Sequence, residues 1–247
     1  MNAVLQRRHP TFFEYGNNII RAVGIFNYGI SLSCHIYFTS TAHKELFGSS
    51  FRCITIWAAT IQFIYFVLGF YYCIDDIIEL SPIGYEIRVG ILIFRDYLGE
   101  TLAFPLSVLV PISFWSVYTF KGEWLPVNEL ATIPFWLHHM LHTVSFPLQI
   151  LTIAFDSNAN TETLEGTFCI SFFYISYFIW LLHIQNQTHE WVYPALNSSS
   201  TLIKVVLSAT ILTGHFALYA FGKWLATTFW GRRRRRIRWS RHNSSIQ

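Results

Sequence analysis

Long runs of apolar residues alternate with short polar segments along this chain. A helix that crosses the hydrocarbon core of a bilayer, about 30 Å thick, needs roughly 20 mainly apolar residues. Runs of about that length extend over residues 22–38, 54–74, 98–120, 133–155, 167–184 and 202–225. The pattern therefore predicts an all-α fold: a polytopic integral membrane bundle of about six transmembrane helices.

A shorter apolar segment, residues 83–94, contains Glu86 and Arg88 and is too short to cross the bilayer. We expect it to lie at the membrane interface between the second and third helices. The third and fourth helices contain prolines, which membrane helices tolerate where neighbouring helices satisfy the carbonyl groups that they release. These prolines are Pro105, Pro111 and Pro147.

Composition supports the same class, since 53% of the 247 residues are hydrophobic and only 13% are charged. Soluble domains carry more charge. Basic residues precede the first apolar run and follow the last, as Arg7, Arg8 and Arg21 and as the run from Arg232 to Arg236. Because cytosolic loops are enriched in Lys and Arg, we expect both termini in the cytosol, with the host membrane the endoplasmic reticulum or the plasma membrane.

This orientation divides the chain into a cytosolic N-terminal segment (1–21), a transmembrane domain (22–229) and an arginine-rich cytosolic tail (230–247). An arginine run can also bind nucleic acid, but directly after a membrane helix we interpret it as a topology signal that contacts anionic lipid. Membrane lipid, not nucleic acid, is the expected partner.

The four cysteines all lie within or beside the apolar runs, and no Cys-x-x-Cys spacing occurs. We expect buried thiols without disulfides and no zinc site built on sulfur. The cysteines are Cys34, Cys53, Cys73 and Cys169. Asn186 and Asn197 stand in glycosylation sequences within a loop expected outside.

Histidines at membrane depth are the strongest chemical signal, because ionisable groups are costly there and often functional. His138, His139 and His142 share one predicted helix, and His183 and His215 lie on the next two. Three roles remain open from these residues alone. Imidazoles can hydrogen-bond between helices, ligate metal or haem, or act as general base for a hydroxyl nucleophile. Only one His-His-x-x-His box is present, whereas di-iron lipid enzymes need several.

Several blocks together resemble the androgen-induced and androgen-dependent TFPI-regulating protein family. The block Phe94-Arg-Asp-Tyr-Leu-Gly-Glu-Thr-Leu-Ala-Phe-Pro-Leu-Ser107 is similar to the family signature. Pro134-Phe-Trp-Leu-His-His-Met-Leu-His-Thr-Val-Ser-Phe-Pro147 resembles its Trp-Leu-x-His-x-x-His-Thr block. Asp75-Asp76 and Trp191-Val-Tyr-Pro194 match further motifs in the same order. The resemblance covers about residues 50–195.

The resemblance implies a multi-pass hydrolase that cleaves fatty acid esters of hydroxy fatty acids, with a threonine nucleophile and a histidine base. The family's histidine falls on His142, and its threonine falls on Thr55 in Arg52-Cys-Ile-Thr55, with Gln62 following. His138 departs from the family, whose members tend to have Asn there, and we assign it no chemistry. This mechanism needs no cofactor and no metal. The alternatives from other classes are a histidine-ligated redox protein and a non-catalytic scaffold or channel.

Helix depth makes the pairing feasible. The second and fourth helices both begin at the outer face, with Thr55 about one residue and His142 about nine residues into them, a difference of about 12 Å at 1.5 Å per residue. We expect His139, or a carbonyl released by Pro147, to orient the His142 ring. The sequence does not identify oxyanion donors, acyl-chain preference or oligomeric state.

Overall fold

The computed structural model describes residues 12–42, 47–78, 85–125, 132–155, 162–197 and 199–244. Most of the predicted N-terminal segment lies outside the described residues, as do the side chains of the arginine-rich tail, of Cys73 and of Asp75 and Asp76. Across the described ranges the chain is helical and contains no strand.

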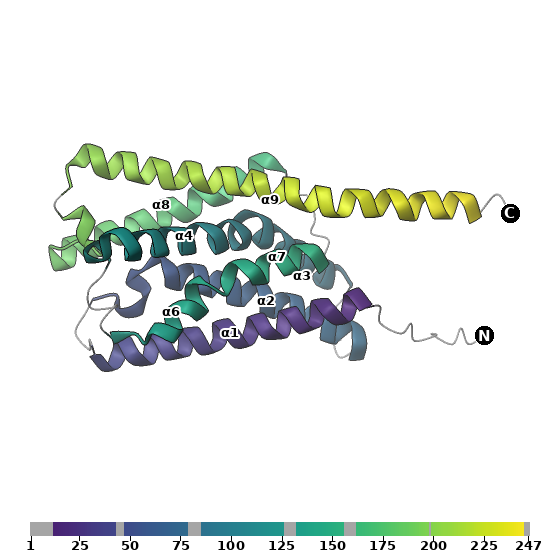
Figure 1. The fold of residues 1–247 in the computed structure, drawn as a ribbon, viewed down its shortest axis with the longest axis horizontal. Coiled ribbons are helices and arrows are strands. Elements are labelled where there is room, and N and C mark those ends of the chain that lie inside the picture. Colours follow the sequence, from purple (N-terminus) through teal and green to yellow (C-terminus); the bar gives the residue numbers. More distant parts are fainter. Residues whose placement is uncertain are drawn as a thin grey trace.

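The helices run side by side along one axis (Figure 1). They are α1 (Phe12–Ala42), α2 (Ile54–Ile78), α3 (Tyr85–Leu98), α4 (Phe104–Lys121), α6 (Phe135–His142), α7 (Ser145–Phe155), α8 (Thr163–Thr188) and α9 (Thr201–Ser244). Three short 3₁₀ segments, η1 (Ser49–Arg52), η3 (Gly122–Trp124) and η4 (Pro194–Leu196), and a π-helical turn, η2 (Gly99–Ala103), complete the described elements.

Five helical stretches among the described residues are long and apolar enough to cross a membrane. They are Tyr15–Thr41, Ile54–Tyr71, Val89–Phe120, Thr163–Thr188 and Thr201–Phe229. The remaining predicted span, the fourth, corresponds to α6 and α7, which follow each other through the bundle (Figure 1). The predicted fold class, a helical membrane bundle, is confirmed.

The third span differs from the prediction. Residues 83–94 do not form a separate interfacial segment in their described part, because α3 continues through η2 into α4. Arg95 forms an ion pair with the adjacent Asp96, and both side chains are buried. Charge near the start of this span therefore does not end the helix.

The fourth span breaks after His142, and Pro147 explains where. A proline has no N–H to donate, and its ring collides with the carbonyl four residues earlier, which here belongs to Thr143. The N–H groups of Thr143 and Val144 both bond to the His139 carbonyl, at 2.8 and 3.1 Å. The Met140 carbonyl instead accepts from Asn27 of α1, at 3.1 Å. An amide from another helix thus joins the broken segment to α1.

Two prolines of α4 also leave a carbonyl without its helix donor, and a side chain from another helix donates to each. Pro105 has no N–H for the carbonyl of Thr101, and His215 Nε2 of α9 donates to that carbonyl at 2.8 Å. Pro111 leaves the carbonyl of Ser107, to which the Ser145 hydroxyl of α7 donates at 3.4 Å. Neighbouring helices therefore satisfy released carbonyls, as the sequence predicted.

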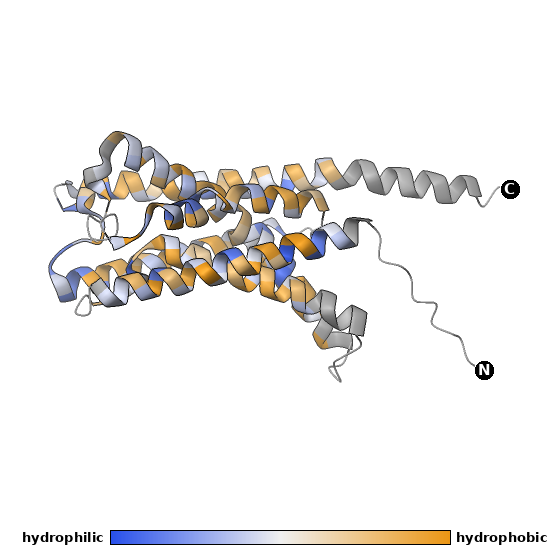
Figure 2. Cartoon of the chain, turned by 60° about the horizontal axis from the view of Figure 1, so that its bottom comes forward, coloured by the Kyte–Doolittle hydropathy of each residue, from blue (hydrophilic) through white to orange (hydrophobic). Residues whose placement is uncertain are grey.

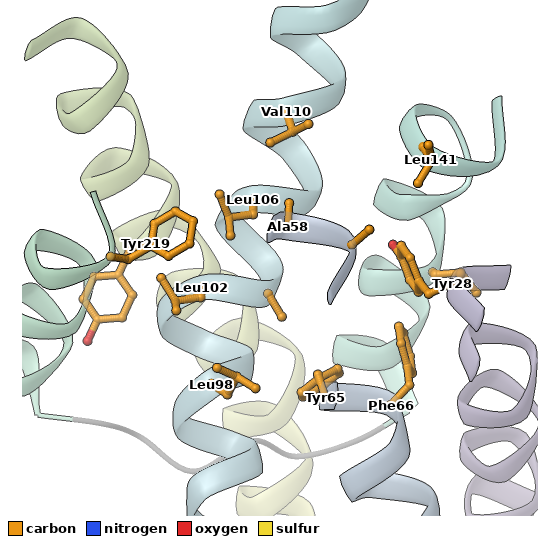
Figure 3. Packing of buried hydrophobic residues seen from close by; sticks show 14 of the residues in the cluster. Tyr28, Ala58, Tyr65, Phe66, Leu98, Leu102, Leu106, Val110, Leu141 and Tyr219 are labelled. Carbon is orange, nitrogen blue, oxygen red and sulfur yellow. The ribbon is translucent and has the colours of Figure 1, made fainter. Parts of the chain in front are cut away.

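Polar and apolar residues share the interior. Figure 3 shows the apolar part of the core, where Tyr28 of α1 stacks on Phe66 of α2 with ring centroids 5.9 Å apart.

A buried amide pair lies among these helices: Gln149 donates to Gln62 at 2.5 Å, and Gln62 donates to the Ala103 carbonyl, also at 2.5 Å. Figure 2 shows that apolar residues run along most of the length of the helices. Many of the large apolar side chains are exposed on the outside of the bundle, and Phe120 is 80% exposed. The hydrogen bonds of Gln62 and Gln149 satisfy polar groups in the interior, where lipid offers no hydrogen-bond partner.

The beginning of α1 and the end of α9 lie at the same end of the bundle (Figure 1). An even number of crossings produces this arrangement. The segments η1, η3 and η4 connect helices at the opposite end.

Candidate functional site

A small cavity lies inside the bundle, near the end remote from the two chain ends. Its volume is about 40 Å³. The residues that line it come from α1, α2, α4, α6 and the adjoining connections: His35, Cys53, Thr55, Phe114, Leu125, Ile133, His138, Leu141, His142 and Tyr193. Both residues of the predicted catalytic pair are among them.

Thr55 lies in the first turn of α2, where the N–H groups have no acceptor within their own helix. Tyr193 fixes this helix start, because its hydroxyl accepts from the Ile54 N–H at 3.2 Å. The Tyr177 hydroxyl lies 2.9 Å from that of Tyr193 and donates to the Arg52 carbonyl at 3.0 Å. The Trp191-Val-Tyr-Pro194 motif therefore contributes a tyrosine that supports the residue next to Thr55.

His142 is the last residue of α6, and its ring lies flat against Phe114 of α4. The ring centroids are 3.8 Å apart and the planes differ by 3°. Nδ1 of His142 is buried and has no hydrogen-bond partner within the described part of the chain. The expected orienting groups are therefore wrong: neither His139 nor a carbonyl released by Pro147 bonds to this ring. Aromatic stacking holds it instead.

His139 points away from the cavity. Its side chain is exposed, Nδ1 lies 2.9 Å from the Thr143 hydroxyl, and its ring lies beside Phe135 and Trp115. His139 and His142 are three positions apart, but the interior position belongs to His142 and to His138 one turn earlier. Sequence spacing alone left that choice open.

His138 and His35 also line the cavity, and both side chains are buried. Nε2 of His138 and Nδ1 of His35 have no hydrogen-bond partner among the described residues. The sequence analysis missed His35 as a site residue. The criterion that identified the other histidines applies to it too, since it is an ionisable residue within the first predicted span.

The two remaining membrane histidines, His215 and His183, lie outside the cavity and contact other parts of the bundle. His215 uses both nitrogens: Nε2 donates to the Thr101 carbonyl, and Nδ1 lies 3.0 Å from the Tyr174 hydroxyl. It thereby joins α9 to η2 and α8. His183 is exposed, beside the rings of Phe47 and Trp180.

The described side chains include no group of three His, Cys, Asp or Glu residues arranged to hold a metal ion. No disulfide joins the cysteines described, Cys34, Cys53 and Cys169. Cys53 does line the cavity, two residues from Thr55.

The block Phe94–Ser107 has a different place. It forms the end of α3, η2 and the start of α4, and none of its residues is among those that line the cavity. Arg95, Asp96 and Glu100 are buried within it. The block builds the π turn and the packing around it, whereas Thr55 and the 134–147 block form the cavity.

A helical bundle with an apolar outer surface and a buried cavity of threonine and imidazole side chains defines a polytopic membrane protein with an internal polar site. The chain belongs to the FAR-17a/AIG1-like protein family, whose model matches residues 19–227. This confirms the family resemblance predicted from the motifs.

Individual relatives agree with the family assignment. The chain is 30% identical to the rat androgen-dependent TFPI-regulating protein over 185 residues, which cover 74% of this chain and 79% of the relative. It is 26% identical to the human protein of that name, again over 185 residues that cover 74% of this chain and 79% of the relative. Identity to the human androgen-induced gene 1 protein is 26% over 222 residues, covering 86% of this chain and 90% of the relative. No solved structure matches.

Proposed function

We propose that this protein is a membrane hydrolase that cleaves the ester bond of fatty acid esters of hydroxy fatty acids. Thr55 is the nucleophile and His142 is its base. The observation that carries the proposal is that these two residues, 87 positions apart by subtraction of their numbers, line one cavity of about 40 Å³. The family resemblance points to the same two residues.

The chemistry suits these two side chains. A threonine hydroxyl is a weak nucleophile until a base removes its proton, and imidazole is the common base for that task. Thr55 Oγ1 attacks the ester carbonyl, His142 takes the hydroxyl proton and passes it to the leaving alkoxide, and an acyl-threonine remains. Water then releases the acid. Negative charge that develops on the carbonyl oxygen is favoured near the first turn of α2, where helix N–H groups point outward.

The surroundings favour a lipid substrate. Apolar side chains occupy the cavity wall between the polar groups, and Phe114, Ile133 and Leu141 are among them. The helices around the cavity expose apolar surface to lipid. A volume of about 40 Å³ is too small for the alkyl chains, so in this proposal the chains lie outside the cavity.

Orientation completes the proposal. The beginning of α1 and the end of α9 share one end of the bundle, and we propose that this end is cytosolic, because basic residues concentrate at both chain ends. The cavity then lies toward the outer side of the host membrane, the endoplasmic reticulum or the plasma membrane.

A fluorophosphonate probe tests the nucleophile directly, because it forms a stable bond with an activated hydroxyl. The purified parental protein should label and should hydrolyse a branched fatty acid ester. Thr55→Ala should abolish both signals. Thr60→Ala is the matched control, since Thr60 lies on the same helix, donates to the Ile56 carbonyl at 2.8 Å and does not line the cavity.

For the base, His142→Ala should lower labelling and hydrolysis by about 10²- to 10⁴-fold. His139→Ala is its control, because that exposed ring lies on the same helix outside the cavity. A folded Thr55→Ala protein that still labels and hydrolyses at the parental rate would rule out the mechanism. Cys53 would then be the next nucleophile to replace.

A further inference from the structure

His35 is a buried histidine of α1 that has no role in the reaction described so far. It is 1% exposed, and it lines the same cavity as Thr55 and His142. The hydroxyls one turn away on either side behave differently: Ser31 and Thr39 each donate to the carbonyl four residues earlier in α1, at 2.6 and 2.5 Å. His35 is therefore a polar side chain of α1 that faces the cavity, and its Nδ1 has no partner in the described part of the chain.

Three histidines line this cavity, and each has a buried ring nitrogen without a hydrogen-bond partner among the described residues: His35 Nδ1, His138 Nε2 and His142 Nδ1. A buried polar atom left unpaired costs about 1–3 kcal/mol. A bound water needs roughly 10–15 Å³ and two to four polar partners. The cavity, at about 40 Å³, meets the volume requirement, and the polar side chains that line it include Thr55, His35, His138 and His142. Imidazoles of α1 and α6 therefore lie around a space large enough for water.

Ester hydrolysis by an acyl-threonine requires such a site, because lipid surrounds the bundle and supplies no water. Resting on the proposed function, we propose that His35 binds and positions the water molecule that releases the acyl group from Thr55. In this step the water oxygen forms a bond to the acyl carbon, and the bond from that carbon to Thr55 Oγ1 breaks. One water proton passes to His142 and from there to Thr55 Oγ1. The products are the free fatty acid and the threonine hydroxyl.

His35 contacts water only, so its replacement affects one half of the reaction. Formation of the acyl-threonine consumes no water and needs only Thr55 and His142. Its breakdown needs a correctly placed water, and misplacement of a reactant by about 1 Å can cost on the order of 10²-fold in rate. A structural histidine would instead affect both halves together.

Two variants of the full-length protein separate these possibilities. His35→Phe keeps a ring of similar shape and removes both nitrogens, and His35→Asn retains a polar amide near the position of Nδ1. Each is compared with the parental protein for the rate of fluorophosphonate labelling, for the burst and steady-state release of nitrophenol from a p-nitrophenyl fatty acid ester, and for acyl-protein by intact mass. Ser31→Ala is the matched control, as another buried polar position of α1.

We expect His35→Phe to label within about twofold of the parental rate and to release one equivalent of nitrophenol in a burst. Its steady-state rate should fall at least about tenfold, with an acyl group retained on Thr55. Hydroxylamine, which attacks acyl esters without a positioned water, should restore release of the acyl group. His35→Asn should recover a large part of the steady-state rate, and Ser31→Ala should match the parent.

Equal losses of labelling and turnover in both His35 variants would overturn the inference, and so would an unchanged steady-state rate in His35→Phe. Either result would leave Thr55 and His142 in place, provided that the parental protein labels and turns over. A parental protein that neither labels nor hydrolyses ester would instead overturn the proposed function, and this inference with it.

Discussion

At the scale of single residues, the contact between Phe114 and His142 is the closest ring pair at the cavity. The two rings are parallel to within 3°, with centroids 3.8 Å apart. A base must present its nitrogen in one direction, and a hydrogen bond from a carboxylate often fixes that direction. Here a flat aromatic surface restrains the imidazole ring without a hydrogen bond to Nδ1 from the described residues.

Phe114→Ala should therefore weaken the base without removing it. Aromatic pairs contribute about 0.5–1.5 kcal/mol, so we expect probe labelling and ester turnover to fall roughly two- to tenfold. Phe120→Ala changes the same residue type on the same helix at a position that is 80% exposed, and it should have no effect on either rate. Equal activities of the two variants would show that the stack does not orient His142.

The proposed nucleophile and base should also behave as one unit. Thr55→Ala and His142→Ala each disable the same acylation step, so the double variant should be scarcely slower than the slower single variant. Steady-state hydrolysis of a branched fatty acid ester by all four proteins measures this. Independent, multiplicative losses would contradict a shared step.

The family resemblance pointed to Thr55 and His142, which line one cavity, but it did not point to the other imidazoles there. The rotation of α6 about its axis determines whether His138 or His139 faces inward, and sequence spacing does not give that rotation. His35 contributes to the cavity from α1, more than 100 residues away by subtraction of its number from that of His142. No spacing within a single helix reports such a contact.

At the scale of helices, Gly24 marks a place where the backbone of one helix lies directly against a side chain of its neighbour. A Cβ atom added at Gly24 of α1 would overlap the Phe66 ring of α2, whereas one added at Gly90 of α3 would meet no atom within 4 Å. The close approach of α1 and α2 holds His35 beside the start of α2.

Gly24→Ala should destabilise the bundle, because Phe66 is fully buried and cannot move aside cheaply. Overpacking of this kind costs about 1–3 kcal/mol. Gly90→Ala makes the same chemical change in open space and should be neutral or slightly stabilising. The midpoints of thermal unfolding in one detergent compare the two variants. A Gly24→Ala protein as stable as the Gly90→Ala protein would contradict the packing described.

Hydropathy predicted the existence of the helices but not all of their boundaries. It ended the second span at charged residues and began the third at Leu98, ten residues after Arg88. Side-chain pairing between Arg95 and Asp96 allows the helix to continue, and hydropathy does not report pairing. The prolines were visible in the sequence, but whether each one breaks, bends or merely interrupts a helix depends on the donors that surrounding helices provide.

At the scale of the whole molecule, the described ends of α1 and α9 lie together, and the cavity lies toward the opposite end. The number of apolar runs and the placement of arginines in the sequence already predicted an even number of crossings. The family and the helical membrane class were also predicted from sequence. Orientation relative to the cytosol remains a prediction.

Protease treatment of sealed microsomes tests that orientation. Epitopes placed at the N-terminus and at the C-terminus should both be removed from the cytosolic side. A single cysteine at Asn197, which is exposed in the loop after α8, should react with an impermeant maleimide only after the membrane is opened. Protection of one epitope and digestion of the other would mean an odd number of crossings.

The bond from His215 to the Thr101 carbonyl spans 114 residues of sequence, and this separation has a consequence for biosynthesis. Helix α4, with Pro105, enters the membrane well before α9 is translated. Until α9 arrives, the Thr101 carbonyl has neither its own helix donor nor a water molecule in the hydrocarbon to bond with, and such a group costs several kcal/mol. The nascent bundle therefore stays incomplete until its last helix docks. A chain that ends before His215 leaves that carbonyl without the donor that α9 supplies.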